Sequence, residues 1–434
     1  MTHDTTRRGF HVAGLARVEG EGELHVEVRD GAVTEVALDI FEPPRFFEAL
    51  LRGRRHSEAP EITSRICGIC PVAYQMSACA AIEDACGVSV GPSIVALRRL
   101  LYCGEWIQSH ALHVHLLHAP DFLGCEDAVE LAARDRTAVE RGLELKRIGN
   151  LLMETIGGRS VHPVNVRVGG FYRAPEPSAV RALAEPLRRA RDAALATTEW
   201  VASFEFPDVE NDYRFVALRG KDAYPIESGR VASSEGLDTD PAGFAALAVE
   251  EQVARSTALH SRLEGRYAYL TGPLARYGLN SGVLPEIARQ AAAAAGLGPV
   301  CRNPFRSIVV RSIELVFACD EALRLVESYE PPEPPSAEVP PAAGVGTGAT
   351  EAPRGLLLQS YELDADGIIC SARIMPPTSQ NQLTIEDDLR RVVQSSLAMS
   401  DEQLTRRCEL TVRNHDPCIS CAAHFLDVRV ERHP

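Results

Sequence analysis

Residues 416–424 read Asp-Pro-Cys-Ile-Ser-Cys-Ala-Ala-His, and residues 65–70, near the other end of the chain, read Arg-Ile-Cys-Gly-Ile-Cys. Each stretch holds a pair of cysteines separated by two residues. Two such pairs, brought together in space, supply four thiolates, the soft ligand set that selects zinc, iron–sulfur clusters or another soft transition metal. We therefore predict a metal site that joins the two ends of the chain.

The composition is that of an ordinary globular protein. Of the 434 residues, 45% are hydrophobic and 24% are charged, and no apolar run is long enough to span a bilayer. The formal net charge of −15 argues against a nucleic-acid partner, because phosphate binding requires a basic surface. The N-terminus shows no secretory signal, and the 12 cysteines are too scattered for a disulfide framework. We therefore expect a cytoplasmic protein without a membrane span.

The spacing of apolar residues predicts a mostly helical α+β fold. From 24 to 40 they recur at strand spacing around Asp30-Gly31, which predicts an N-terminal β-hairpin. A short helix that carries Glu48 follows Pro43-Pro44. Longer helices are expected at 72–86, from 92 through the four histidines of 110–118, and at 128–156, 178–204, 241–263, 284–295 and 305–327. The architecture we expect is a central bundle of long helices with small peripheral sheets.

Residues 1–424 are expected to form a single domain. Its parts are an N-terminal β-hairpin region (1–60), a helical body (61–330), an exposed Pro/Gly-rich loop (331–350) and a C-terminal β and metal-binding segment (351–424). Within the last part, apolar runs at 356–358, from 368 to Pro376, and at 408–412 predict short strands.

Residue types and spacing alone leave three kinds of metal site open: a structural zinc, an iron–sulfur cluster or a catalytic soft-metal site. A structural zinc is disfavoured, because its cysteine pairs usually come from one compact knuckle and not from opposite ends of a helical body. Charged residues beside the thiolates, namely Arg65, Asp416 and His424, favour tuned reactivity over a sealed cluster. The histidines of 110–118 lack a metal-binding spacing, so we expect them to serve in packing or hydrogen bonding.

The two cysteine motifs together resemble those of the large subunit of nickel-iron hydrogenases. Further segments recur in the order found in that family: Arg17-Val18-Glu19-Gly20, the short helix with Glu48, residues 110–121, and Glu351-Ala352-Pro353-Arg354-Gly355. The resemblance covers essentially the whole chain and implies the nickel-iron hydrogenase large-subunit fold.

The resemblance also implies a ligand set. Cys67 and Cys418 would be terminal nickel ligands, whereas Cys70 and Cys421 would bridge nickel to an iron that carries cyanide and carbon monoxide. Glu48 and His424, with a backbone carbonyl near Arg373 or Ile374, would hold a magnesium or a second iron.

Other matching residues would surround the metals. Arg354 would project over them beside Pro353, in a carboxylate-lined cap formed by Asp121 and Asp416. Thr378 would hydrogen-bond a cyanide. Splitting H2 requires a base, and a thiolate, Arg354 or Glu19 could act; because the pKa of arginine lies above about 12, we favour a thiolate that hands the proton to Glu19.

The implied activity is reversible heterolytic cleavage of H2, with electrons passed to an iron–sulfur small subunit. Residues 224–230 and 361–364 are most similar to the cytoplasmic bidirectional, NAD(P)-linked group. Since no Gly-x-Gly-x-x-Gly strand–helix unit occurs, the flavin and nicotinamide would bind to separate diaphorase subunits. Two alternatives are a hydrogen-sensing regulatory hydrogenase and a quinone-reductase subunit related to complex I, whose members lack the four cysteines.

Two features depart from the commonest family pattern. Tyr74 and Gln359-Ser360 stand where many or several relatives have histidine. Residues 425–434 follow the histidine at which the mature family chain commonly ends. We expect a maturation endopeptidase to remove this extension after metal insertion; a terminal strand is the alternative.

Overall fold

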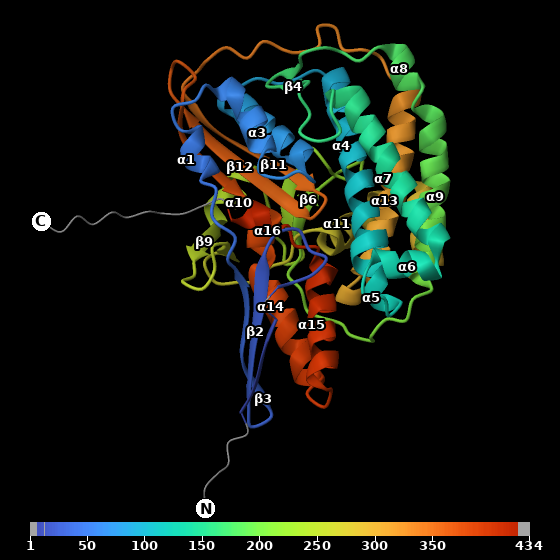
Figure 1. The fold of residues 1–434 in the computed structure, drawn as a ribbon. Coiled ribbons are helices and arrows are strands. Elements are labelled where there is room, and N and C mark those ends of the chain that lie inside the picture. The colour runs from blue at the N-terminus through green and yellow to red at the C-terminus, as the bar shows by residue number, and fades with distance from the viewer. Residues whose placement is uncertain (1–6, 13, 424–434) are drawn as a thin grey trace, which may run out of the picture.

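A computed structural model describes residues 7–12 and 14–423. Its centre is the predicted bundle, in which α4 (Pro92–Leu112), α7 (Arg136–Gly157), α9 (Ala184–Ala202) and α13 (Ser307–Glu327) lie side by side (Figure 1). Glycine allows α4 and α7 to approach closely, since a Cβ atom on Gly149 would lie 2.7 Å from the carbonyl oxygen of Gly104. In the described part of the chain, no helix combines the length and apolar character that a membrane crossing demands.

The predicted N-terminal hairpin is confirmed. It consists of β2 (Gly22–Arg29) and β3 (Ala32–Ile40), with β1 (Arg7–Val12) added antiparallel to β2. Asp30 and Gly31 both have positive φ, as a two-residue type I′ turn requires. The apolar face of the hairpin packs on α14 (Pro377–Ser395) and α15 (Asp401–His415), which extend below the main body in Figure 1.

A second three-stranded sheet lies against α3 (Pro71–Ala85). Its strands, in spatial order, are β11 (Gly344–Ala352), β12 (Gly355–Leu363) and β13 (Ile369–Met375), all antiparallel. The prediction of an exposed loop over 331–350 is therefore wrong from Gly344 onward. Glycines are required there by packing: a Cβ on Gly346 would lie 2.1 Å from the carbonyl oxygen of Ala81 on α3.

Three further predictions of secondary structure differ from the structure. The helix predicted over 241–263 stops after α10 (Pro241–Leu247), where the chain enters the antiparallel pair β9 (Ala248–Gln252) and β10 (Leu259–Leu263). The strand predicted at 408–412 belongs to α15, which begins at a capping box formed by Ser400 and Gln403. The helix predicted over 128–156 is interrupted at Asp135, whose side chain caps α7 by accepting from the Ala138 N–H.

The remaining elements are short. The helices are α1 (Phe47–Leu51), α2 (Ala59–Ser64), α5 (Ala119–Phe122), α6 (Ala128–Arg134), α8 (Pro177–Arg181), α11 (Pro273–Asn280), α12 (Glu286–Ala294) and α16 (Ile419–Ala422). The strands are β4 (Val166–Arg167), β5 (Gly170–Phe171), β6 (Val216–Arg219), β7 (Arg230–Ser233) and β8 (Asp238–Thr239). Single turns of other helix types lie at His56–Glu58, Ser281–Val283 and Pro304–Arg306, and a π-helical segment, His113–His118, continues α4.

Candidate metal centre

The four cysteines of the two motifs meet in the interior. Their Sγ atoms all lie within 4.8 Å of one another, and all four side chains are buried as free thiols. Sγ–Sγ distances are 3.5 Å from Cys67 to Cys418, 3.7 Å from Cys70 to Cys421 and 2.7 Å from Cys418 to Cys421. The structure therefore confirms that the two ends of the chain bring their cysteines together.

Backbone contacts hold the C-terminal pair in place. Residue Glu19 forms a parallel β-bridge with Cys418, and its carbonyl oxygen accepts the Ile419 N–H at 2.9 Å. The Cys418 N–H donates to Oγ1 of Thr378 at 2.9 Å. Thr378 thus fixes the backbone of a cysteine, a contact that the sequence did not predict; its hydrogen bond to a cyanide stays a prediction.

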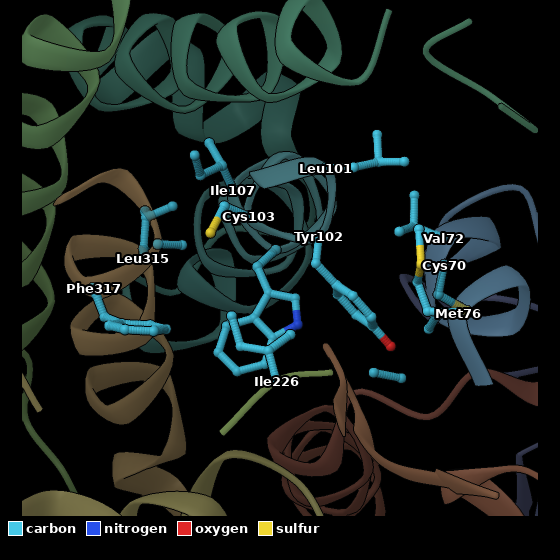
Figure 2. Packing of buried hydrophobic residues seen from close by; sticks show 14 of the residues in the cluster. Cys70, Val72, Met76, Leu101, Tyr102, Cys103, Ile107, Ile226, Leu315 and Phe317 are labelled. Atoms are coloured by element: carbon cyan, nitrogen blue, oxygen red, sulfur yellow. The ribbon is translucent and has the colours of Figure 1, made fainter. Parts of the chain in front are cut away.

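The N-terminal pair is held by a buried carboxylate that sequence reasoning missed. Cys70 is the residue before the first turn of α3, and Glu105 of α4 accepts the N–H groups of Val72 at 2.6 Å and Ala73 at 3.1 Å. Glu105 is completely buried, and burial raises the pKa of its carboxyl group well above the usual range. Figure 2 shows Cys70 at one edge of the surrounding apolar cluster, with Val72 beside it and Phe317 at the opposite edge.

The close contact of the four buried thiols shifts the pKa values of Cys67 and Cys418 in opposite directions. Hydrogen bonding with Cys418, Cys421 and Cys70 lowers the pKa of Cys67 well below that of a free thiol. Burial raises the pKa of Cys418 well above it. A bound soft metal cation would favour the thiolate form of all four cysteines, because a thiol must lose its proton before it binds such a metal.

An arginine and an aspartate lie together near the thiols. Nε of Arg354 donates to the Asp416 carbonyl oxygen at 3.0 Å, and its Nη2 lies 3.1 Å from Oδ1 of the same residue. Both side chains are buried, and Nη1 of Arg354 and Oδ2 of Asp416 have no hydrogen-bond partner among the described residues. Such unpaired buried polar atoms indicate a space meant for another group. Although burial opposes it, the charges of Asp416 and the cysteines raise the pKa of Arg354 further above its usual value.

Asp121, predicted to share this cap, points elsewhere. Its carboxylate pairs with Arg17 at 2.6 Å and with Nε and Nη2 of Arg413 at 2.7 and 2.8 Å. The two arginines supply the charge that neutralises this carboxylate, so it has no need of Arg354 as a partner. Asp121 therefore fixes Arg413, three residues before Asp416, and does not contact Arg354.

The histidines of 110–118 do not converge on one point. Nε2 of His113 bonds to the Arg413 carbonyl oxygen at 2.9 Å, that of His115 to Thr197 at 3.1 Å, and that of His118 to Asn414 at 3.1 Å. The expectation that they serve in packing and hydrogen bonding is confirmed.

Glu19 contacts the thiol cluster directly. Its Oε2 accepts from Sγ of Cys418 and from the Ser420 N–H, both at 3.1 Å, and burial raises its pKa above that of a free glutamate. Sequence reasoning missed Glu42, whose Oε2 accepts the Ser420 hydroxyl at 2.8 Å. The one signal in the sequence that could have pointed to Glu42 is its position directly before Pro43-Pro44.

The predicted second metal site is described in part. Glu48 is buried, and its Oε1 accepts the Ile374 N–H at 2.6 Å, so the helix and strand segments predicted for this site do meet. His424 and the extension 425–434 lie outside the described residues. Tyr74 and Gln359, which stand where relatives have histidine, contact each other: Nε2 of Gln359 donates to the Tyr74 carbonyl oxygen at 2.9 Å.

Comparison with known proteins gives a consistent result. The family model described as "Nickel-dependent hydrogenase" matches residues 45–150. The chain is 33% identical to the alpha subunit of Sulfhydrogenase 1 of Pyrococcus furiosus, over 95% of this chain and 97% of that protein. It is 27% identical to an F420-non-reducing hydrogenase subunit of Methanothermobacter marburgensis, over 95% of this chain and 94% of that one.

Solved structures agree with these sequences. The fold matches an NAD+-reducing [NiFe]-hydrogenase in the H2-reduced state, with a TM-score of 0.86, 27% identity, and coverage of 97% of this chain and 100% of that one. A [NiFeSe]-hydrogenase of Dm. baculatum, 22% identical, has the same fold, with a TM-score of 0.78 and coverage of 96% and 100%.

Proposed function

Because the chain belongs to the nickel-dependent hydrogenase family, as a large catalytic subunit, we propose that it cleaves H2 reversibly and heterolytically at a nickel-iron centre bound by its four clustered cysteines. The observation that supports this most directly is the group of four buried free thiols within 4.8 Å, drawn from opposite ends of the chain.

The donor set fits these metals. Soft thiolates suit nickel and iron, and Cys67, Cys70, Cys418 and Cys421 would together hold the two metals. The iron would carry cyanide and carbon monoxide, which no side chain provides. When bound, the metals supply the electron-accepting centre at which H2 is polarised and split.

The protein side chains then handle the proton and the charge. Glu19, 3.1 Å from Sγ of Cys418, would accept the proton at Oε2 and carry it away from the site. Arg354, fixed by Asp416, would stay charged and direct its unpaired Nη1 into the space above the thiols. The Pro353 peptide would set the direction of Arg354, and Glu48 with His424 would hold a magnesium or second iron beneath.

Electrons would leave through a small subunit with iron–sulfur clusters and reach NAD(P) through flavin-containing diaphorase subunits. The similarity to an NAD+-reducing hydrogenase supports this acceptor over the alternatives suggested by the names of other relatives. A nicotinamide acceptor also fits the expected cytoplasmic location. We further propose that a maturation endopeptidase removes residues 425–434.

Metal analysis combined with infrared spectroscopy of the purified complex tests the assignment. We expect nickel, iron, cyanide and carbon monoxide bands, and H2-dependent reduction of NAD(P). Zinc without these bands would refute the nickel-iron centre.

The proposed proton acceptor is tested by Glu19→Gln, which keeps the shape and removes the basic oxygen. We expect loss of hydrogen–deuterium exchange with an intact metal centre, whereas Glu23→Gln, at an exposed glutamate paired with His11, should behave as the wild type. Full exchange activity in Glu19→Gln would exclude this route.

A further inference from the structure

A second arginine, Arg276 of α11, lies behind Arg354 and is completely buried. Arg354 occupies the tight turn between β11 and β12, where Ala352 pairs with Gly355. This turn presses against the residues that precede α11, since a Cβ on Gly272 would lie 2.7 Å from the Arg354 carbonyl oxygen. The element that carries Arg276 therefore supports the turn from behind.

Side chains hold three consecutive carbonyl groups just before Arg354. Nη1 of Arg276 donates to the carbonyl oxygen of Ala352 at 2.7 Å, and its Nη2 donates to that of Pro353 at 2.9 Å. Nε1 of Trp106 donates to the carbonyl oxygen of Glu351 at 3.1 Å. Side-chain donors thus fix the backbone that leads into Arg354 at each of these three carbonyl groups. The backbone of the turn alone does not supply these donors.

Two buried carboxylates fix Arg276 in turn. Its Nε and Nη2 each lie 2.8 Å from an oxygen of Glu314, and its Nη1 lies 3.0 Å from Oε2 of Glu351. The guanidinium group also stacks over Trp106, 4.5 Å from the ring centroid. With two carbonyl and three carboxylate contacts, all five N–H donors of the guanidinium are used.

Only arginine can make this set of contacts. Lysine is a point charge with three donors on a flexible stem and cannot bridge two carboxylates and two carbonyls in one plane. A side chain required only to neutralise Glu314 and Glu351 would have no need to reach the carbonyls of Ala352 and Pro353. The geometry therefore indicates a role in shaping the turn.

We propose that Arg276 is a positioning residue for Arg354, which it serves by locking the backbone from Glu351 to Pro353 so that the Arg354 side chain is held above the cysteine cluster. This inference rests on the proposed function, in which Arg354 acts beside the metals. None of the hydrogen bonds that Arg276 makes reaches a cysteine, so its effect on the site would be indirect.

A double-mutant cycle tests this dependence in the assembled complex. Arg276→Lys should lower kcat for H2 oxidation by about 10- to 100-fold, because displacement of a catalytic group by about 1 Å has an effect of this size. If Arg276 acts through Arg354, Arg276→Lys combined with Arg354→Lys should be no slower than Arg354→Lys alone. Nickel and iron content should stay at wild-type levels. Multiplicative effects in the double variant would overturn the proposal.

A matched control separates positioning from loss of a buried ion pair. Arg98, also buried, makes two hydrogen bonds to Glu83, at 2.9 and 2.6 Å, and has no contact with the 351–354 turn in the hydrogen bonds described. Arg98→Lys should destabilise the protein while leaving kcat within about twofold of the wild type. A fall in kcat equal to that of Arg276→Lys would count against a specific role for Arg276.

Amide hydrogen exchange supplies a readout that does not depend on turnover. In Arg276→Lys, the peptide covering 349–358 should exchange at least about tenfold faster than in Arg98→Lys, because the locked turn is released. Equal amide exchange rates of this peptide in the two variants would overturn the proposal. This outcome does not depend on whether the protein has the proposed hydrogenase activity. If the Arg276→Lys variant fails to assemble, Trp106→Phe takes its place. This change removes the N–H donor to the Glu351 carbonyl oxygen. The double-mutant cycle and the exchange measurement are then decided by the same outcomes.

Discussion

Replacement of Glu105 should loosen the first cysteine pair without touching a cysteine. The carboxylate of Glu105 accepts the N–H groups of Val72 and Ala73, the first free donors of α3 after Cys70. Glu105→Gln keeps the volume but offers one oxygen, and its NH2 group then faces a backbone N–H. One buried donor is left unpaired.

The expected loss of stability follows from these two contacts. Leaving one buried N–H donor unpaired costs about 1–3 kcal/mol, so Glu105→Gln should cost about 2 kcal/mol and Glu105→Ala, which removes both acceptors, about twice that, plus the cost of a cavity. With an unfolding entropy of about 2.1 cal/mol/K per residue, 2 kcal/mol lowers the Tm of a chain of this size by about 2 °C. Metal binding should be affected more strongly than Tm, because the turn that is released carries Cys67 and Cys70, two of the four cysteines.

Thermal unfolding and nickel content of the purified complex measure both consequences. Glu83→Gln is the matched control, since Glu83 is a buried carboxylate at the other end of α3, paired with Arg98. Both variants should lower Tm, but only Glu105→Gln should lower nickel per chain. Wild-type Tm and nickel content in Glu105→Gln would refute the role of Glu105 as the acceptor that holds the first cysteine pair.

Three further changes test the packing and charge described above. Gly348→Ala would place a Cβ 2.4 Å from a backbone oxygen of α3 and should cost about 1–3 kcal/mol or more by thermal unfolding, whereas Gly282→Ala, with no atom within 4 Å, should be neutral. Burial lowers the pKa of His115 from 6.5 to about 3. Between pH 6.5 and pH 3, therefore, the unfolded chain binds a proton at this histidine and the folded protein does not. The free energy of unfolding falls as the pH is lowered through this range, by about 2 kcal/mol at pH 5. His115→Gln should therefore show a smaller fall in Tm from pH 7 to pH 5 than the wild type. Asp121→Asn should lower stability by about 3 kcal/mol, because Arg413 loses its nearest carboxylate and keeps only the more distant Glu409, at 3.4 Å, as a charged partner. The kcat per assembled metal centre should stay within about tenfold of the wild type, and a complete loss of turnover would return Asp121 to the cap.

Local pattern was sufficient to predict several of the regular elements. The hairpin turn at Asp30-Gly31 and the bundle helices α4 and α13 follow from periodicity and turn chemistry that neighbouring residues determine by themselves. The cysteine motifs were equally visible, because their spacing is local and their residue type is rare. Their meeting in space was an inference from chemistry, since four thiolates need a common partner.

Several errors came from residues whose role is set by distant neighbours. The glycines of β11 resemble a loop in sequence, and only the backbone of α3, pressed against them, explains why they form a strand. Glu105 lies among apolar residues of α4 and gives no sign of the helix end that it caps. Asp121 matched a family segment, but its direction is set by pairing with Arg17 and Arg413, which are distant in the sequence.

Three of the buried arginines, Arg276, Arg311 and Arg413, share one structural task that follows from the irregular backbone of the site. Arg276 donates to the carbonyls before Arg354, Arg311 donates to the Asn414 carbonyl oxygen at 2.9 Å, and Arg413 donates to that of Ala16 at 2.7 Å. These carbonyls belong to segments that are neither strand nor helix interior, so they lack regular partners and would be costly to bury unpaired. A guanidinium group can satisfy such a carbonyl and a carboxylate together, which an apolar side chain cannot do. We infer that a catalytic centre assembled from chain ends and turns requires buried arginines as backbone supports, and that this requirement explains why three of the largest fully buried side chains carry charge.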